Sequence, residues 1–216
     1  IVAQGTILDG SHPPGIIGGD STASLIRESH ENKKVKAIVL RVDSGGGSAF
    51  ASEVIREEIV AAKSKGIKVI ASMSNVAASG GYWISASADE IWASHNTITG
   101  SIGIFGFIPT FERTLEEIGI HTDGVATTKI GGGMNAFRKL DPALGEILQS
   151  SIEFGYERFI GLVADERDMT KEDVNKIAQG RVWDGKTALS LGLVDHLGNL
   201  KEATERAAKL AKVENF

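Results

Sequence analysis

The sequence predicts an α/β fold built on a layered, largely parallel sheet. KAIVLRVDS (36–44) is an apolar, β-branched run that ends in SGGGS, and ASEVIREEIVAAKSKG (51–66) follows with apolar residues at helical spacing. IKVIASMS (67–74) is then a second buried strand. Strand, glycine turn, helix and strand in this order are typical of parallel strands joined by right-handed crossovers.

The composition is that of an ordinary globular chain. It has 216 residues, of which 42% are hydrophobic and 24% are charged, enough to bury the core of a single domain. The net charge is −5, so the chain lacks the positive potential that attracts phosphate groups, and this argues against nucleic-acid binding. The chain has no cysteine, and this excludes disulfides and thiolate zinc sites.

Neither a membrane span nor a signal peptide is predicted. No apolar run reaches the roughly 18 residues that a span requires. The first residues, IVAQGTILDG, have the pattern of a strand and a turn. We therefore expect a mature product or an excised fragment of a longer protein.

The elements of the amino-terminal part follow from caps and glycines. A short helix is predicted at STASLIRESHENKKV (21–35), with Asp20 or Ser21 as its N-cap. Gly66 takes the C′ position of the helix at 51–66. GGYWISASA (80–88) is predicted as a helix of small residues, and DEIWASHNTITGSIGIFG (89–106) as a strand region interrupted by glycines.

The carboxyl-terminal part is expected to be mainly helical. A strand is expected at IHTDGVAT (120–127), before a Gly-rich loop at KIGGGMNAF (129–137). Helical patterns follow at 141–167, 170–179 and 199–213. As one domain, the chain would comprise an α/β core with the nucleophile (1–125), the Gly-rich loop (126–140) and a helical part (141–216).

A serine at the start of the small-residue helix is the candidate nucleophile. Ser79 lies in NVAASGGYWIS (75–85), directly after a buried strand, where unpaired backbone N–H groups favour developing negative charge. The N–H groups of Gly80 and of Gly47 in the SGGGS loop are the candidate oxyanion donors. The motif differs from the G-x-S-x-G elbow, since Ala77 precedes Ser79 by two residues. A tight strand-to-helix turn without function is the alternative interpretation.

No residue in the sequence is an obvious base for Ser79. The five histidines lie in loops, on a polar helix end or at strand edges, and His95 and His121 are the least unsuitable of them. A neutral, desolvated lysine is the other option, and Lys129 and Lys139 flank the Gly-rich loop. Both lysines have the ordinary pattern of solvated surface charges.

The motifs together resemble the signal peptide peptidase A family, bacterial Ser–Lys proteases of the Clp/crotonase superfamily. The matching stretches run in family order over nearly the whole chain: VKAIVLRVDSGGGS, ASEVIR, NVAASGGYWIS, TITGSIGIFG, IHTDGV, RFIGLVADER and IAQGRVWDGKTALSLGLVDHLGNL. The resemblance implies a Clp/crotonase-like core of repeated ββα (βαβ) units in a layered sheet. The family usually has a proline where this chain has Gly45, a change that removes no backbone donor.

The resemblance also assigns roles to residues. It implies that Ser79 is the nucleophile, that the N–H groups of Gly47 and Gly80 form the oxyanion hole, and that Ser101 hydrogen-bonds the lysine base. Members with one core domain carry that lysine where this chain has Met134, which cannot accept a proton. The chain therefore resembles the C-terminal half of the long, tandem-repeat form, whose N-terminal half supplies the lysine.

Partners and location follow from the same resemblance. It implies hydrolysis of hydrophobic peptides such as cleaved signal peptides, with no cofactor and no metal. It also implies a lysine-bearing N-terminal half of the same protein, a homo-oligomer that is a tetramer in the long form, and a place at the inner membrane facing the periplasm.

Two other classes of function stay open at this point. A crotonase-type acyl-CoA enzyme uses the same fold and a similar oxyanion hole, but it needs a carboxylate beside that hole, and the first carboxylate after Ser79 is Asp89. A non-catalytic domain that completes an oligomer is the other alternative, because the base is missing from the chain.

Overall fold

The computed structural model describes residues 1–128 and 130–214, and the chain divides into two compact units. Unit 1 comprises Ile1–Gly103 and Phe159–Phe216, and unit 2 comprises Ile104–Arg158. The first of the two segments of unit 1 ends at Gly103. The Gly-rich loop expected at 126–140 lies within unit 2.

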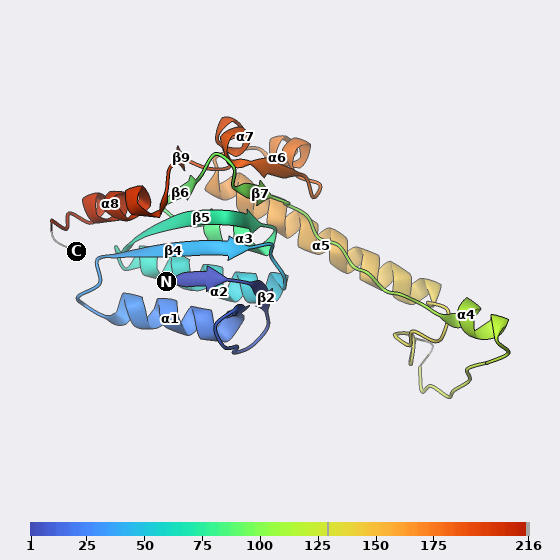
Figure 1. Ribbon diagram of the computed structural model, residues 1–216. Helices are drawn as coiled ribbons and strands as arrows, with labels where there is room; N and C mark the ends of the chain where they lie inside the picture. Colours follow the sequence, from blue (N-terminus) through green and yellow to red (C-terminus); the bar gives the residue numbers. More distant parts are fainter. Residues whose placement is uncertain (129, 215–216) are drawn as a thin grey trace. The chain divides into compact units, whose positions relative to one another are not determined.

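A mostly parallel sheet is the centre of unit 1 (Figure 1). Among the described residues its path is β1-β4-β5-β6-β9, and β7 pairs with both β5 and β8. Of the strand pairs that residues 1–128 and 130–214 form in this sheet, β7–β8 is antiparallel and the others are parallel. The strands are β1 (Val2–Gln4), β4 (Ala37–Ser44), β5 (Lys68–Ala78), β6 (Glu90–Ala93), β7 (Ile98–Gly100), β8 (Val182–Asp184) and β9 (His196–Leu197). A separate parallel pair is formed by β2 (Thr6–Leu8) and β3 (Ile16–Gly18).

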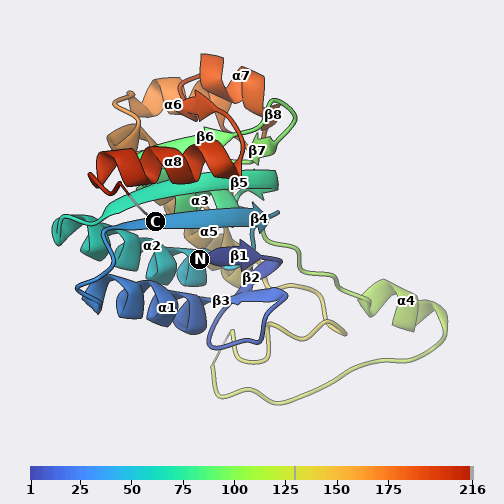
Figure 2. The ribbon, with the colours of Figure 1, turned by 60° about the vertical axis from the view of Figure 1, so that its left-hand side comes forward.

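Helices cover both faces of this sheet (Figures 1 and 2). Alternate residues of β4, among them Ile38, Leu40 and Val42, are buried on the face that carries α2 and α3. The helix α8 packs on the other face, where Ala203 and Ala207 contact Ile70. The helices of unit 1 are α1 (Gly19–Glu31), α2 (Ala49–Ser64), α3 (Gly80–Ala86), α6 (Lys171–Ile177), α7 (Gly185–Ser190) and α8 (Leu200–Leu210), together with the end of α5 (Pro142–Glu166).

The strand and helix predictions for the core are confirmed within a few residues. The predicted elements at 36–44, 51–66, 67–74 and 80–88 correspond to β4, α2, β5 and α3. Gly66 has φ +81°, as a C′ residue requires. The antiparallel strand β8, the helix α7 and the two-residue strand β9 were not predicted, because each is short and depends on partners far away in the sequence.

Two sequence predictions are wrong. The N-cap of α1 is Gly18 rather than Asp20 or Ser21, because the Ser21 hydroxyl bonds the backbone of His12 and Gly18 instead. No strand forms at 120–127, where the described residues have no neighbouring strand to complete a ladder.

The end of β5 changes its partners just before Ser79. Its first part pairs with β6 at Ile70–Ser72, and its last part pairs with β7 at Val76–Ala78. The register against β4 shifts between Val42 and Ser44, which marks a bulge in the ladder. The carboxyl end of β5, which leads to Ser79, therefore lies beside β7 rather than β6.

Unit 2 is a segment without a core of its own. It contains α4 (Glu112–Glu117) and most of α5. No described residue from 104 to 158 is buried, and Phe105 and Phe107 are more than four-fifths exposed. Its chain is therefore not held by apolar burial within the described structure.

The long helix α5 has charged residues along its length. No helix in the described part of the chain is both long and apolar enough to cross a lipid bilayer.

Candidate active site

Ser79 occupies a strained turn between β5 and α3. Its backbone has φ 52° and ψ −120°, outside the regions that an L-residue ordinarily adopts. The Ser79 N–H donates to the Gly100 carbonyl at 2.8 Å, and the Ser79 carbonyl accepts from the Trp83 N–H at 2.9 Å. The turn is thus fixed by β7 on one side and by the first turn of α3 on the other. Backbone strain of this kind is concentrated at functional sites.

The SGGGS loop approaches this turn more closely than any side chain would allow. A Cβ atom added to Gly46 would lie 2.7 Å from the Ser79 Cβ and 2.7 Å from the Gly80 nitrogen. Gly46 also has φ +103°. Only glycine fits here, because it supplies both the backbone conformation and the missing volume.

The backbone N–H groups of Gly47 and Gly80 make no hydrogen bond within the described structure. The residues on either side of Gly47 are hydrogen-bonded to Ile7 of β2. The Ile7 N–H donates to the Gly46 carbonyl, and the Ser48 N–H donates to the Ile7 carbonyl, both at 2.9 Å. The N–H of Gly47 therefore points away from β2. A Cβ on Gly80 would lie 3.3 Å from the Gly47 nitrogen, so the two glycines are neighbours. Among residues 1–128 and 130–214 neither N–H has a hydrogen-bond acceptor.

The start of α2 holds the glycine loop in place. Ser48 is the N-cap of α2, and its hydroxyl accepts from the Ala51 N–H at 3.1 Å. The same hydroxyl donates to the carboxylate of Asp9, which follows β2. The Gly47 N–H is thus positioned between β2 and a capped helix end.

The helix behind Ser79 is rigidly packed. The Tyr82 hydroxyl donates to the Leu193 carbonyl at 2.8 Å, and burial raises the pKa of Tyr82 above its ordinary value. The Trp83 ring packs on Phe159 at a centroid distance of 4.5 Å, and its N–H donates to Glu53 at 2.7 Å. All residues of α3 are buried, which favours a fixed position for Ser79.

Ser101 lies beside Ser79 on the neighbouring strand end. Ala78 of β5 pairs with Gly100 of β7. The residues that follow them, Ser79 and Ser101, are therefore neighbours at the ends of the two strands. Ser101 is half-buried and has φ 50°. The structure therefore brings all four predicted site residues to one end of the sheet: Gly47, Ser79, Gly80 and Ser101.

Within the described part of unit 1, no lysine or histidine is hydrogen-bonded to Ser79. His95 is two residues before Thr97, whose hydroxyl donates to the Ser74 carbonyl. Ser74 precedes Ser79 by five residues, about 16 Å at the usual strand rise. The rings of His12, His30 and His196 bind Asp9, Glu58 and Glu90.

The remaining candidate bases are not placed relative to Ser79. His121, Met134 and Lys139 belong to unit 2. Lys129 lies outside the described residues. The described part of unit 1 thus contains the serine and the two backbone donors without a base hydrogen-bonded to the serine.

Asp89 is too far from Ser79 to act at this site. Its carboxylate accepts from the Val69 N–H at 2.8 Å, near the start of β5. Val69 precedes Ser79 by ten residues, about 33 Å of extended strand. Asp89, the first carboxylate after Ser79 in the sequence, therefore cannot serve as the acid/base group that a crotonase-type enzyme needs beside its oxyanion hole.

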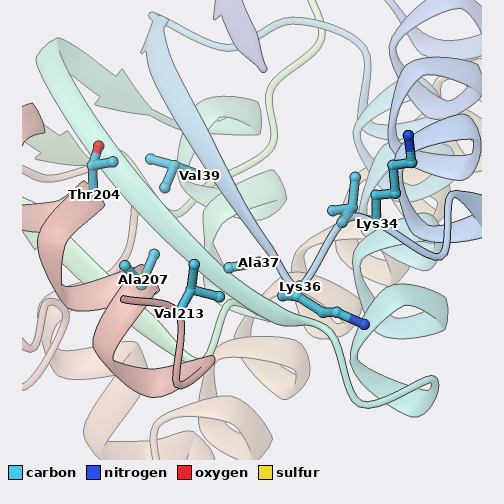
Figure 3. A pocket seen from close by; sticks show the side chains of 9 residues that line it. Lys34, Lys36, Ala37, Val39, Thr204, Ala207 and Val213 are labelled. Carbon is cyan, nitrogen blue, oxygen red and sulfur yellow. The ribbon is translucent and has the colours of Figure 1, made fainter. Parts of the chain in front are cut away.

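A hollow of about 330 Å³ lies at the opposite end of β4 (Figure 3). Ala37 and Val39 of β4 face Ala207 of α8 across it, and the ammonium groups of Lys34 and Lys36 extend away from it. Ala37 is seven residues from Ser44, about 23 Å along the strand. The hollow is therefore not part of the candidate site.

Sequence reasoning missed two features of this site. It did not single out Gly46, although three consecutive glycines before a helix indicate a close backbone approach. It also missed residues 178–183, which pair with the chain at Ser101. No local pattern could reveal that contact, because about 80 residues separate the two segments.

Comparison with known proteins identifies relatives of this chain. The model of "Peptidase family S49" matches residues 61–214. Protease 4 of Salmonella typhi is 53% identical over 216 residues, which are all of this chain and 35% of that protein. Protease 4 of Haemophilus influenzae is 49% identical over 96% of this chain and 34% of its own length. "Serine protease SPPA, chloroplastic" of Arabidopsis thaliana is 38% identical over 94% of this chain and 30% of its own length.

The chain thus spans about a third of the length of these relatives. Among solved structures, the ClpP1 N165D mutant from Listeria monocytogenes has a TM-score of 0.63 and 16% sequence identity, and the match covers 94% of this chain and 92% of that one. This similarity confirms the predicted Clp/crotonase-like α/β fold.

Proposed function

The chain belongs to peptidase family S49, and from this premise we propose that Ser79 is the nucleophile of a Ser–Lys peptidase. The observation that carries the proposal is the turn at Ser79, where a strained serine lies beside the unused N–H groups of Gly47 and Gly80. Such an arrangement suits acyl transfer, because the two donors stabilise the oxyanion that forms when the serine attacks a carbonyl.

The reaction follows from these groups. A neutral lysine accepts the proton of the Ser79 hydroxyl, and the oxygen attacks the scissile carbonyl carbon. The tetrahedral oxyanion is stabilised by the N–H groups of Gly47 and Gly80. The protonated lysine gives its proton to the leaving amine, and water hydrolyses the acyl-enzyme. The hydroxyl of Ser101 hydrogen-bonds the lysine and orients it.

The lysine is supplied by another segment of polypeptide, the N-terminal half of the same protein. Two observations support this. No lysine in the described part of unit 1 is hydrogen-bonded to Ser79, and the chain spans only about a third of its long relatives. The family resemblance agrees with this proposal, since it assigns Met134 to the position at which single-core members carry the base.

The substrates are hydrophobic peptides, foremost cleaved signal peptides at the inner membrane. The enzyme acts on the periplasmic side as a homo-oligomer, a tetramer for the full-length form. An extended apolar peptide would pair with strand edges beside Ser79 and place its side chains in pockets. Replacing the apolar residues of a cleaved peptide by charged ones is expected to prevent its hydrolysis.

The test is peptidase activity on a fluorogenic apolar peptide. The chain is assayed alone and after mixing with a lysine-bearing N-terminal half, and each sample has a Ser79→Ala counterpart. Activity that appears only in the mixture and disappears with Ser79→Ala is the expected result. Ser79-dependent activity of the chain alone would show that it carries its own base.

A non-catalytic, oligomer-building domain is the second candidate. The described part of unit 1 has no lysine or histidine hydrogen-bonded to Ser79, and this favours it. Mixtures that assemble but hydrolyse nothing above the Ser79→Ala background would select this function instead.

A further inference from the structure

The backbone at Ser101 needs outside support to keep its conformation. Gly100 and Ser101 have φ values of 79° and 50°, so two consecutive residues lie on the left-handed side. A serine remains there only when its surroundings determine the conformation. The direction of the Ser101 hydroxyl depends on this backbone, because the side chain leaves from its Cα atom.

The chain after α6 supplies this support. Residues 178–183, which we name the brace, run antiparallel to residues 99–102. The Ser101 N–H donates to the Arg181 carbonyl at 2.7 Å, and the Gly180 N–H donates to the Ile102 carbonyl at 3.0 Å. Both bonds extend the β7–β8 ladder past the pair of Gly100 and Val182. The brace is therefore hydrogen-bonded to Ser101 at its own N–H and to the carbonyl of the next residue, Ile102.

The contact between the brace and Ser101 is close as well as hydrogen-bonded. A Cβ atom on Gly103 would lie 2.9 Å from the Gly180 nitrogen. A Cβ atom on Gly100 would lie 3.0 Å from Cδ1 of Trp183. The indole ring of Trp183 thus lies against the residue that precedes Ser101.

Trp183 also fixes the brace to the end of α6. Its Nε1–H donates to the Ile177 carbonyl at 3.0 Å, and the Arg181 guanidinium donates to the Lys176 carbonyl at 2.9 Å. These bonds satisfy carbonyls that the last turn of a helix leaves unpaired. Trp183 is half-buried and connects α6 to Gly100 through a single side chain.

We propose that Trp183 is a positioning residue for Ser101: its ring holds Gly100 while its N–H anchors the brace, and together they aim the Ser101 hydroxyl at the base. The proposal rests on the proposed Ser–Lys function of the same site. Trp183 acts through Ser101 and needs no contact with substrate.

A double-mutant cycle tests this in the reconstituted mixture of this chain with the lysine-bearing half. Trp183→Leu removes the ring and the donor, and it is expected to lower kcat about tenfold while KM changes less than about twofold. In a Ser101→Ala background the same substitution is expected to lower kcat less than about twofold, because nothing is left to position. Full additivity of the two substitutions would overturn the proposal.

The conservative variant separates the two contacts of Trp183. Trp183→Phe keeps an aromatic ring against Gly100 and loses only the bond to Ile177, so its kcat is expected to lie between those of the wild type and Trp183→Leu. The matched control is Trp92→Phe, which loses the indole bond to Glu90 at 3.1 Å. Trp92 pairs with Ser72, seven residues before Ser79, and its variant is expected to keep the wild-type kcat.

A measurement without catalysis distinguishes failure of this proposal from failure of the proposed function. Hydrogen exchange of the Ser101 amide, which is bonded to Arg181, is expected to accelerate about tenfold in Trp183→Leu and to stay unchanged in Trp92→Phe. Unchanged exchange in Trp183→Leu would refute the positioning role even if the enzyme is active. Loss of Ser79-dependent activity in the unmodified mixture would instead refute the proposed function.

Discussion

Gly46 lets the backbone of the SGGGS loop lie directly against the side chain of Ser79, in the turn between β5 and α3. It lies where any Cβ atom would overlap Ser79 and Gly80, and its φ is +103°. Its neighbour Gly45 is exposed and has no positive φ, and a Cβ atom added to it would meet nothing within 4 Å. The two glycines therefore differ sharply in what they contribute, although they are adjacent.

Gly46→Ala is expected to destabilise the protein by about 1–3 kcal/mol, because the added methyl group overpacks the turn. It is also expected to abolish Ser79-dependent peptidase activity, since Ser79 or Gly80 must move. Gly45→Ala is the matched control and is expected to change the free energy of unfolding by less than about 0.5 kcal/mol. Urea unfolding and the peptide assay measure both effects. Equal behaviour of the two variants would contradict the close approach described for Gly46.

A half-buried ion pair joins three elements of unit 1. Arg167, directly after α5, donates to both carboxylate oxygens of Asp195, at 2.6 and 3.1 Å. The same carboxylate accepts from the Ile91 N–H of β6 at 2.7 Å. Burial acts to raise the pKa of Asp195, but the bonds from Arg167 and Ile91 outweigh it, and the pKa lies below its ordinary value.

Asp195→Asn is expected to destabilise unit 1 by about 2 kcal/mol at pH 7, because it weakens hydrogen bonds to a charged group. A lowered folded-state pKa stabilises the protein above the unfolded-state pKa of about 4, and this stabilisation is lost as the pH falls through the folded-state pKa. The difference between wild type and variant should thus stay constant from pH 7 to about 4 and narrow below it. Urea midpoints across this range provide the measurement. A difference independent of pH below about 4 would mean that the charge of Asp195 is not the cause.

At the scale of the whole molecule, exposed large hydrophobic side chains are concentrated in unit 2. Large hydrophobic residues of unit 2 that are exposed include Phe105, Phe107, Ile108, Phe111, Ile118, Ile120, Val125, Ile130, Met134, Phe137, Ile147 and Phe154. Such a concentration of exposed apolar side chains usually marks a place where another polypeptide binds. It supports the proposed assembly with other copies and with the N-terminal half.

A variant of unit 2 tests this assembly. Replacing both Phe105 and Phe107 by serine is expected to reduce the assembled mass in analytical ultracentrifugation without lowering the unfolding temperature of unit 1, since both side chains are exposed. The control is Leu25→Ser in α1, where the leucine is 51% exposed and belongs to unit 1. An unchanged assembled mass in the double variant would exclude these phenylalanines from the interface.

The sequence predicted the core elements because their signals are local. Apolar runs, helical spacing and glycine turns identified β4, α2, β5 and α3, and they placed Ser79 at the right turn. The N-cap of α1 was predicted wrongly because Ser21 bonds the neighbouring loop. The strand at 120–127 was predicted wrongly because an apolar stretch becomes a strand only beside a partner.

The amino-acid sequence by itself determined the α/β class and a serine at a strand-to-helix turn, and its motifs resembled one peptidase family. The tertiary structure decided which backbone groups surround that serine. It brought Gly47 next to Gly80 across more than 30 residues, and it placed the brace against Ser101. The physical reason is that local patterns report the conformation of neighbouring residues, whereas these contacts depend on strand pairing and on the space that missing side chains leave between distant segments.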